Sequence, residues 1–88
     1  MSSFLSPALV RAGRALVGWS QDRLALEAGL ARATVAAHEQ GRGYASPESL
    51  RRMQRTLETA GVRFVQEETW EGVIQVRPTA SPLAKMTK

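Results

Sequence analysis

The stretch SQDRLALEAGLARATVAAHEQGRG, residues 20–43, decides the fold of this chain. Ser20 is typical of a helix N-cap, and Asp22 stands favourably in the first turn that follows it. This helix is expected to stop at Gly29, because glycine readily adopts the left-handed conformation that closes a helix. A second short helix is predicted over residues 32–40, again followed by a glycine. Two short helices joined by a glycine-containing turn can cross at a steep angle.

The segments on both sides each predict a further helix. Each begins with a serine followed by a proline, at Ser6 and Ser46, which suits an N-cap followed by the first helical position. The first helix is expected to end at Gly18, and the other to run through Ala60 before Gly61. Apolar residues recur at helical spacing on both, which predicts one inward face on each. These faces consist of Leu9, Ala12, Gly13 and Leu16 on the first helix, and of Leu50, Met53 and Leu57 on the other.

The character of the sequence changes after Gly61. The segments VRFVQ at 62–66 and VIQVR at 73–77 are β-branched and alternating, and the six residues EETWEG join them, so they predict a β-hairpin. A lone two-stranded hairpin is marginal in water, and it needs a helix face or a second copy beside it. The last segment, residues 78–88, holds two prolines and no apolar periodicity, and is expected to be mobile.

Length and composition indicate one small domain. A chain of 88 residues, 43% of them hydrophobic, has a core near the lower limit for unaided folding, so a partner chain is one way to complete the packing. No segment is long and apolar enough to cross a membrane, and the first residues lack the basic-then-apolar order of a signal peptide. Because the chain has no cysteine, and hence no disulfide frame, a reducing, cytoplasmic setting is expected.

The residue types of a metal or catalytic site do not occur at suitable spacing. The chain has one histidine and no cysteine, and no carboxylate cluster stands at ligand spacing, so neither a metal nor another cofactor is expected. No nucleophile–base pair and no phosphate-cradling glycine loop is recognisable, which predicts that the protein is not an enzyme. The single histidine, His38, is expected to be a packed, hydrogen-bonded residue, with a pH switch as the alternative.

The charge balance favours a polyanionic partner. Twelve basic residues against eight acidic ones give a net charge of +4 and an isoelectric point near 10.7. Ten of the basic residues are arginine, whose forked donor suits phosphates and base edges better than the amine of lysine does. Three of the acids are Glu67, Glu68 and Glu71, so the chain before residue 66 carries this net charge on fewer residues and is more basic per residue than the whole. This indicates a partner such as nucleic acid, the alternative being a basic protein without one.

Several residues of the two central helices and the turns that follow them stand at the spacing of a known motif: Ser20-Gln21, Leu24-Ala25, Gly29, Thr34-Val35, Glu39 and Gly41. With them the chain resembles the helix-turn-helix of the Cro/C1-type (XRE) family of bacterial and phage regulators, in a short single-domain branch. The similarity extends back to Arg14 and forward to Gly61. It implies a mainly α fold, with a four- to five-helix lambda-repressor-like DNA-binding domain over residues 1–61. A C-terminal β-hairpin used in dimerisation, residues 62–77, and a flexible tail, residues 78–88, are expected to follow.

The helix predicted over residues 32–40 is then the candidate recognition helix. With Val35 and His38 on the inner side, the helical period turns small side chains outward. Arg32, near the helix start, is the candidate for direct base readout, because its fork fits guanine O6 and N7; the alternatives are a phosphate contact or simple solvation. Small alanines let the backbone approach the groove floor and touch thymine methyls; alternatively, they only favour helix formation. The predicted base-reading residues are Arg32, Ala33, Ala36 and Ala37.

The resemblance also implies contacts with DNA phosphates and one structural ion pair. The family commonly sets a glutamine against a phosphate at the start of the first motif helix, and its turn after the recognition helix runs beside the DNA backbone. The residues at these and neighbouring positions, expected to contact phosphates, are Gln21, Thr34, Gln40, Arg42 and Tyr44. The alternative for the last three is an ordinary solvated loop, and Thr34 alternatively only shields the helix start. In the family, the glutamate at the position of Glu39 pairs with an arginine, and Arg14 stands at the matching place.

The hairpin segment carries more apolar side chains than one sheet face needs. We therefore expect strands of two chains to pack into a symmetric dimer, unless the hairpin folds back on its own helices. The residues expected at this contact are Val62, Phe64, Val65, Val73, Ile74 and Val76. Together the predictions describe a sequence-specific transcriptional regulator, a repressor that binds an inverted-repeat operator in double-stranded DNA as a homodimer. The alternative is an antitoxin- or antiactivator-like module that binds a partner protein, for which Trp70 is a candidate contact.

Overall fold

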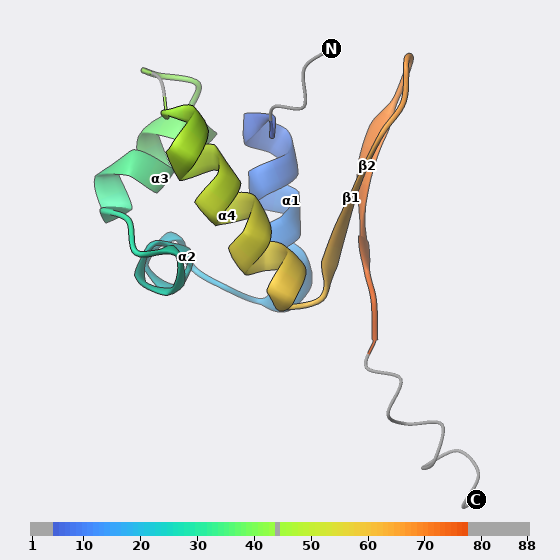
Figure 1. Ribbon diagram of the computed structural model, residues 1–88, viewed down its shortest axis with the longest axis horizontal. Coiled ribbons are helices and arrows are strands. Elements are labelled where there is room, and N and C mark those ends of the chain that lie inside the picture. Colours follow the sequence, from blue (N-terminus) through green and yellow to red (C-terminus); the bar gives the residue numbers. More distant parts are fainter. Residues whose placement is uncertain (1–4, 44, 78–88) are drawn as a thin grey trace, which may run out of the picture.

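The computed structural model of this chain describes residues 5–43 and 45–77. Within them lie four α-helices followed by a two-stranded antiparallel sheet (Figure 1). The elements are α1 (Pro7–Val17), α2 (Gln21–Ala28), α3 (Arg32–Glu39), α4 (Pro47–Thr59), β1 (Val62–Gln66) and β2 (Glu71–Gln75). The mainly α fold with a C-terminal hairpin is therefore confirmed. The tail predicted to be mobile lies outside the described residues, and no helix within them is long and apolar enough to span a bilayer.

Serine side chains begin three of these helices, at the positions where the sequence predicts caps. Ser6, Ser20 and Ser46 each accept a hydrogen bond from the backbone N–H three residues further on, at 3.0–3.1 Å. Each bond satisfies a donor that the first helical turn leaves free. Gly18 and Gly29 follow α1 and α2 with φ angles of 72° and 71°. These left-handed residues let the chain change direction at once, so the first three helices follow one another through short connections.

The core lies where the four helices meet. Its largest fully buried side chains are Val10, Leu24, Val35, Met53 and Leu57. Each helix contributes at least one of them, and Val62 at the start of the hairpin joins the same cluster. Because one cluster is shared by all four helices, their relative positions are fixed together.

The buried face of α1 differs from the predicted stripe. Val10 is completely buried, whereas Leu16, which was predicted to face inward, is 36% exposed. The hairpin accounts for this orientation, because a Cβ atom built on Gly13 would lie 3.3 Å from both Leu57 Cδ1 and Phe64 Cζ. α1 thus turns its glycine toward α4 and the hairpin. The apolar periodicity of the helix alone does not contain this information.

The second strand begins earlier than the sequence predicted. β1 agrees with the predicted segment, but β2 begins at Glu71 instead of Val73, and Gly72 lies opposite Val65 in the ladder. The connection is correspondingly shorter than the six residues predicted, and Glu67 N donates to Trp70 O across it at 2.7 Å. A ladder consists of backbone hydrogen bonds, which glycine and glutamate make as β-branched residues do. Side-chain preference therefore placed the start of this strand too late.

The hairpin has one face against the helices, mainly α1, and one face toward solvent. Alternation along the strands turns Val62, Phe64 and Val73 inward, where Val62 is 3% exposed and the other two pack against the core. Ile74 and Val76 point the other way and are exposed. The prediction that Val62 contacts a second chain is corrected accordingly, because the protomer's own core encloses this side chain. The hairpin folds back on its own helices with one face and leaves the other uncovered.

Candidate nucleic-acid interface

A tight turn joins α2 to α3. Leu30 N donates to Ala25 O at 2.9 Å and Gly29 N donates to Leu26 O at 3.3 Å, which is the arrangement in which a left-handed glycine ends a helix. Leu30 then packs against the core, and α3 begins two residues later. The backbone of the turn thus fixes the direction in which α3 leaves α2.

α3 turns a face of small side chains toward solvent. Ala33 is exposed, and Ala36 and Ala37 are half-buried. Arg32 stands exposed at the N-terminal end of the same helix. The opposite side carries Val35, which is completely buried. The alanine face expected from the sequence is therefore at least partly open to a ligand.

The carboxylate of α3 is held on the inward side. The Glu39 side chain is 2% exposed, and Arg14 donates to both of its oxygens, from Nε to Oε2 at 2.6 Å and from Nη2 to Oε1 at 2.7 Å. Gln21 Nε2 also donates to Oε1, at 3.0 Å. The ion pair joins α1 to the end of α3, and Gln21 adds α2 to the same group.

This carboxylate remains charged despite its burial. Burial raises the pKa of Glu39, but the hydrogen bonds from Arg14 and Gln21 and the charges of nearby guanidinium groups together lower it more, so its pKa lies below the usual value. The hydrogen bond with Glu39 in turn raises the pKa of Arg14. Both groups are therefore ionised near neutral pH, and their contact is a charge-assisted bidentate pair.

A hydrogen bond of His38 joins the end of α3 to the residues that precede α1. Its ring nitrogen Nε2 lies 2.9 Å from the carbonyl oxygen of Leu5, and the side chain is half-buried. Since a carbonyl only accepts, Nε2 carries the hydrogen of this bond. The expectation of a packed, hydrogen-bonded histidine is confirmed.

The residues predicted to contact phosphates differ in their surroundings. Gln21 is half-buried, and its bond to the buried carboxylate is an intramolecular role that the sequence did not indicate. Thr34 is half-buried, whereas Gln40 and Arg42 are exposed. The guanidinium of Arg42 has no ion-pair partner among residues 5–43 and 45–77. Tyr44 lies outside the described residues.

Arg32 has a partner that the sequence did not reveal. Its Nε lies 3.0 Å from Oδ1 of Asp22, in the first turn of α2, and the two side chains are 63% and 76% exposed. From the sequence alone, Asp22 is only a favourable residue for a helix start. The nine residues between the partners contain a turn, so the contact between Asp22 and Arg32 depends on how the two helices cross and has no signal in the local sequence.

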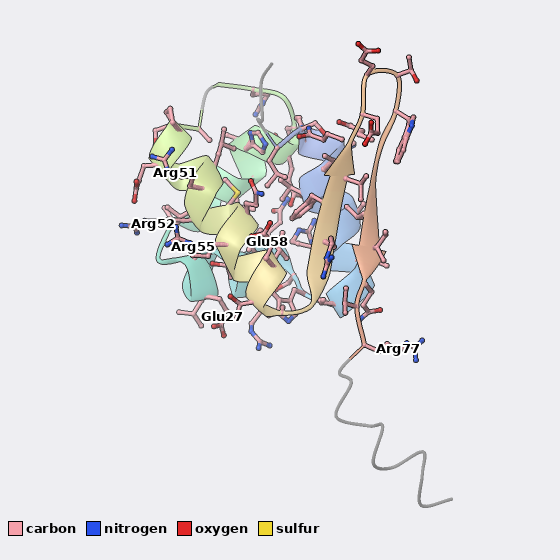
Figure 2. All side chains as sticks on the ribbon, turned by 45° about the vertical axis from the view of Figure 1, so that its right-hand side comes forward. Glu27, Arg51, Arg52, Arg55, Glu58 and Arg77 are labelled. Atoms are coloured by element: carbon pink, nitrogen blue, oxygen red, sulfur yellow. The ribbon has the colours of Figure 1, made fainter. Side chains whose placement is uncertain are left out.

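α4 carries a further group of arginines. Arg51, Arg52 and Arg55 project from the side of α4 that lies away from the hairpin (Figure 2). Arg52 donates to Glu48 at 3.1 Å and to the carbonyl of Gly29 at 3.3 Å. Arg51 also contacts Glu48, at 3.6 Å. Glu48 compensates part of the positive charge of these arginines, and the bond from Arg52 to Gly29 connects α4 to the turn between α2 and α3.

The residues and turns described here agree with one known family. A family model described as helix-turn-helix matches residues 10–61, more than half of the chain. The chain belongs to the Cro/C1-type (XRE) helix-turn-helix family. A comparison with curated proteins gave no match.

Membership of the Cro/C1-type family makes this chain one of the DNA-binding transcription regulators. In a helix-turn-helix the second helix is the one that enters the major groove, and here that helix is α3. The hairpin lies beyond the matched residues, so the family match does not account for it. No group of three potential metal ligands occurs in the described part of the chain.

Proposed function

We propose that the protein is a transcriptional repressor that binds an inverted-repeat operator in double-stranded DNA as a homodimer and acts by occupying it. The observation that carries this proposal is the division of charge on α3. Its outward face bears alanines and Arg32, while its carboxylate, Glu39, is turned inward onto Arg14. Such a helix presents a cation and no anion to the groove. The repressor acts in the cytoplasm, without a catalytic step or a cofactor.

The small side chains of α3 suit a close approach to the bases. The major groove is about 12 Å wide and a helix with its side chains is about 10–12 Å across, so alanines at Ala33, Ala36 and Ala37 leave room for the backbone to approach the floor. Their methyl groups then contact thymine methyls, and Arg32 reads guanine. Because few hydrogen-bonding side chains are available, DNA shape contributes to the choice of site.

Contacts with phosphates on both sides of this face fix the position of α3 in the groove. On one side stands Gln21, whose amide nitrogen has a second hydrogen beyond the one given to Glu39. On the other side stand Gln40 and Arg42, exposed and just after α3. Thr34 and Tyr44 complete this proposed set.

The uncovered face of the hairpin supports dimer formation. Ile74 and Val76 are 53% and 42% exposed, and Val65, half-buried, lies on the same face. Exposed apolar side chains gathered on one surface mark sites of protein association. A two-fold dimer would present two copies of α3 about 34 Å apart, which matches an inverted repeat.

The charges of the hairpin are complementary to a second copy of it. The tip carries Glu67 and Glu68, and the opposite end of the hairpin, where β1 begins and β2 ends, carries Arg63 and Arg77. In an antiparallel, two-fold arrangement the acidic tip of each hairpin lies beside the basic end of the other. The same surface on both subunits is then self-complementary, as an isologous contact requires.

Selection of bound duplexes from a randomised library, followed by footprinting and titration, tests the DNA-binding proposal. Wild-type protein should enrich an inverted repeat, and Arg32→Ala should lose it while keeping its fold. For a dimer that neutralises about 6–10 phosphates, affinity should fall roughly 10³–10⁵-fold between about 50 and 200 mM salt. A salt-insensitive complex, or no enriched sequence, would contradict the proposal. Light scattering at micromolar concentration tests the dimer, against which a monomer mass would count.

One observation favours a second candidate function, that of an antitoxin- or antiactivator-like module. Trp70 is 57% exposed near the hairpin tip, and tryptophan is enriched where proteins bind one another. In this alternative the uncovered hairpin face binds a different protein instead of a second copy. A monomer that loses a partner complex on Trp70→Ala, and keeps it on Arg32→Ala, would support this alternative.

A further inference from the structure

An ion pair joins the two motif helices at the place where DNA is proposed to bind. Asp22 Oδ1, in the first turn of α2, lies 3.0 Å from Arg32 Nε, in the first turn of α3, and both side chains are largely exposed. Exposed pairs of this kind contribute little to stability. A carboxylate on this surface also repels the phosphates of any duplex. Asp22 suits the first turn of α2, but its contact with Arg32 is explained neither by stability nor by general affinity for DNA.

We propose that Asp22 is a positioning residue that directs Arg32 to guanine and thereby sets the base selectivity of α3; this inference rests on the proposed DNA-binding function. Nε is the guanidinium nitrogen of Arg32 in this ion pair, and neither it nor Nη1 or Nη2 donates a hydrogen bond within the described residues. These two terminal nitrogens form the fork that matches O6 and N7 of guanine. The attraction of the carboxylate keeps the guanidinium beside α2 and leaves that fork free to donate to a base.

The alanine face explains why Arg32 needs a partner from another helix. A long arginine side chain has many rotamers, and the neighbouring Ala33 and Ala36 are too small to restrict them. An unrestrained guanidinium would reach the phosphates of any sequence, which adds affinity without selectivity. Asp22 stands on α2, whose position relative to α3 is fixed by the Gly29 turn. Asp22 therefore lowers the affinity for all duplexes and enlarges the difference in affinity between duplexes with guanine and those with another base at the contact.

The test compares two affinities for each variant. Wild-type protein first selects duplexes from a randomised library, and the position whose guanine preference disappears in Arg32→Ala is taken as the contact. Dissociation constants are then measured for the selected operator and for the same duplex with adenine in place of that guanine. In Asp22→Asn the ratio of these constants should fall about tenfold, toward that of Arg32→Ala. Affinity for an unrelated duplex should rise, because a negative charge has been removed.

Glu27→Gln is the matched control on the same helix. It removes the same charge and breaks an exposed ion pair, in which Glu27 lies 3.0 Å from Arg23 on the same helix and not from a residue of α3. Affinity for the unrelated duplex should rise as in Asp22→Asn, while the guanine-to-adenine ratio stays at the wild-type value. Asp22→Glu keeps the carboxylate and should retain most of the ratio. Melting curves of all variants show that each is folded.

The outcomes separate this inference from the proposed function. If Asp22→Asn keeps the wild-type ratio, or if Glu27→Gln loses it equally, the inference is overturned while DNA binding stands. The inference is also overturned, with DNA binding unaffected, if Arg32→Ala removes no guanine preference. If wild-type protein selects no duplex, the proposed function fails, and this result is known before any variant of Asp22 is made.

Discussion

The ion pair between Arg14 and Glu39 allows a sharp prediction about stability. Arg14→Ala removes both donors that reach the Glu39 oxygens at 2.6 and 2.7 Å and leaves behind a carboxylate that is 2% exposed. Gln21 keeps one hydrogen bond to it, which does not replace a positive charge. The variant must then hold an uncompensated charge in its interior or protonate it, and both cost free energy.

The expected loss follows from the burial of the two partners. Breaking one side of a buried ion pair costs about 3–5 kcal/mol. Because the Arg14 side chain is 18% exposed, solvent already screens the pair in part, and we expect a loss near the lower end, about 3 kcal/mol. For a domain of this size about 1 kcal/mol lowers the melting temperature by roughly 4–8 °C, so the variant should melt about 12–24 °C below wild type.

Thermal and urea unfolding, followed by circular dichroism, measure this loss. The control is the double variant Arg14→Met with Glu39→Leu, which removes both charges and fills a similar volume, and which should lie close to wild type because no charge is left buried. A loss below about 1 kcal/mol in Arg14→Ala, the value of a surface pair, would refute the reasoning. So would a double variant as unstable as the single one.

The pH dependence of the difference in free energy of unfolding between wild type and Arg14→Ala shows whether the buried charge of Glu39 causes that difference. The pKa of Glu39 is lowered in the folded protein, so its contribution to stability is present above the unfolded pKa, about 4.3, and is lost as the pH falls toward the folded value. In Arg14→Ala, burial without the guanidinium raises this pKa instead, and acidification relieves the buried charge. The difference in free energy of unfolding should therefore shrink between about pH 7 and pH 4. A constant difference would show that Arg14 acts through packing alone.

Three further predictions concern the hairpin, the turn and the DNA backbone. Ile74→Asp should leave the protomer folded and give a monomer by light scattering, and a dimer would exclude the uncovered hairpin face as the interface. Val62→Ala should instead lower the free energy of unfolding by about 2 kcal/mol, because the Val62 side chain is in the core. Gly29→Ala should cost about 1–2 kcal/mol in urea unfolding, because its φ of 71° is left-handed, and an unchanged midpoint would contradict this. Arg42→Ala should weaken binding about equally for all duplexes and reduce the salt slope by about one for each copy bound. An unchanged slope would exclude a phosphate contact.

The helices could be predicted from the sequence because their ends are determined locally. A serine cap needs only the backbone three residues further on, and a closing glycine needs only its own φ. The inward face of α1 could not be predicted in the same way. Val10 is buried in place of Leu16 because Phe64, far along the chain, packs against Gly13. The start of β2 was placed too late for a related reason, since strand pairing is decided between two backbones.

The same distinction holds for the candidate site. Arg32 could be named from its place at the start of a helix, but its ion pair with Asp22 requires the angle between α2 and α3, which no local pattern contains. The phosphate contact of Gln21 likewise follows from the family resemblance. Its bond to Glu39 depends on α1 and α2 enclosing the same carboxylate, and thus on the packed core.

The polar contacts of α3 have a consequence for DNA recognition. Val35 is the one apolar side chain that α3 buries fully, next to Glu39, so apolar burial alone holds this helix weakly. Its orientation is instead fixed at its C-terminal end by the bonds from Arg14 and Gln21 to Glu39 and by the bond between His38 and the Leu5 carbonyl. A helix with larger inward side chains would need no such bonds. Because α3 buries so little apolar area on its inward side, recognition depends on the ion pair there, and weakening that pair should loosen base selectivity even where the protein stays folded.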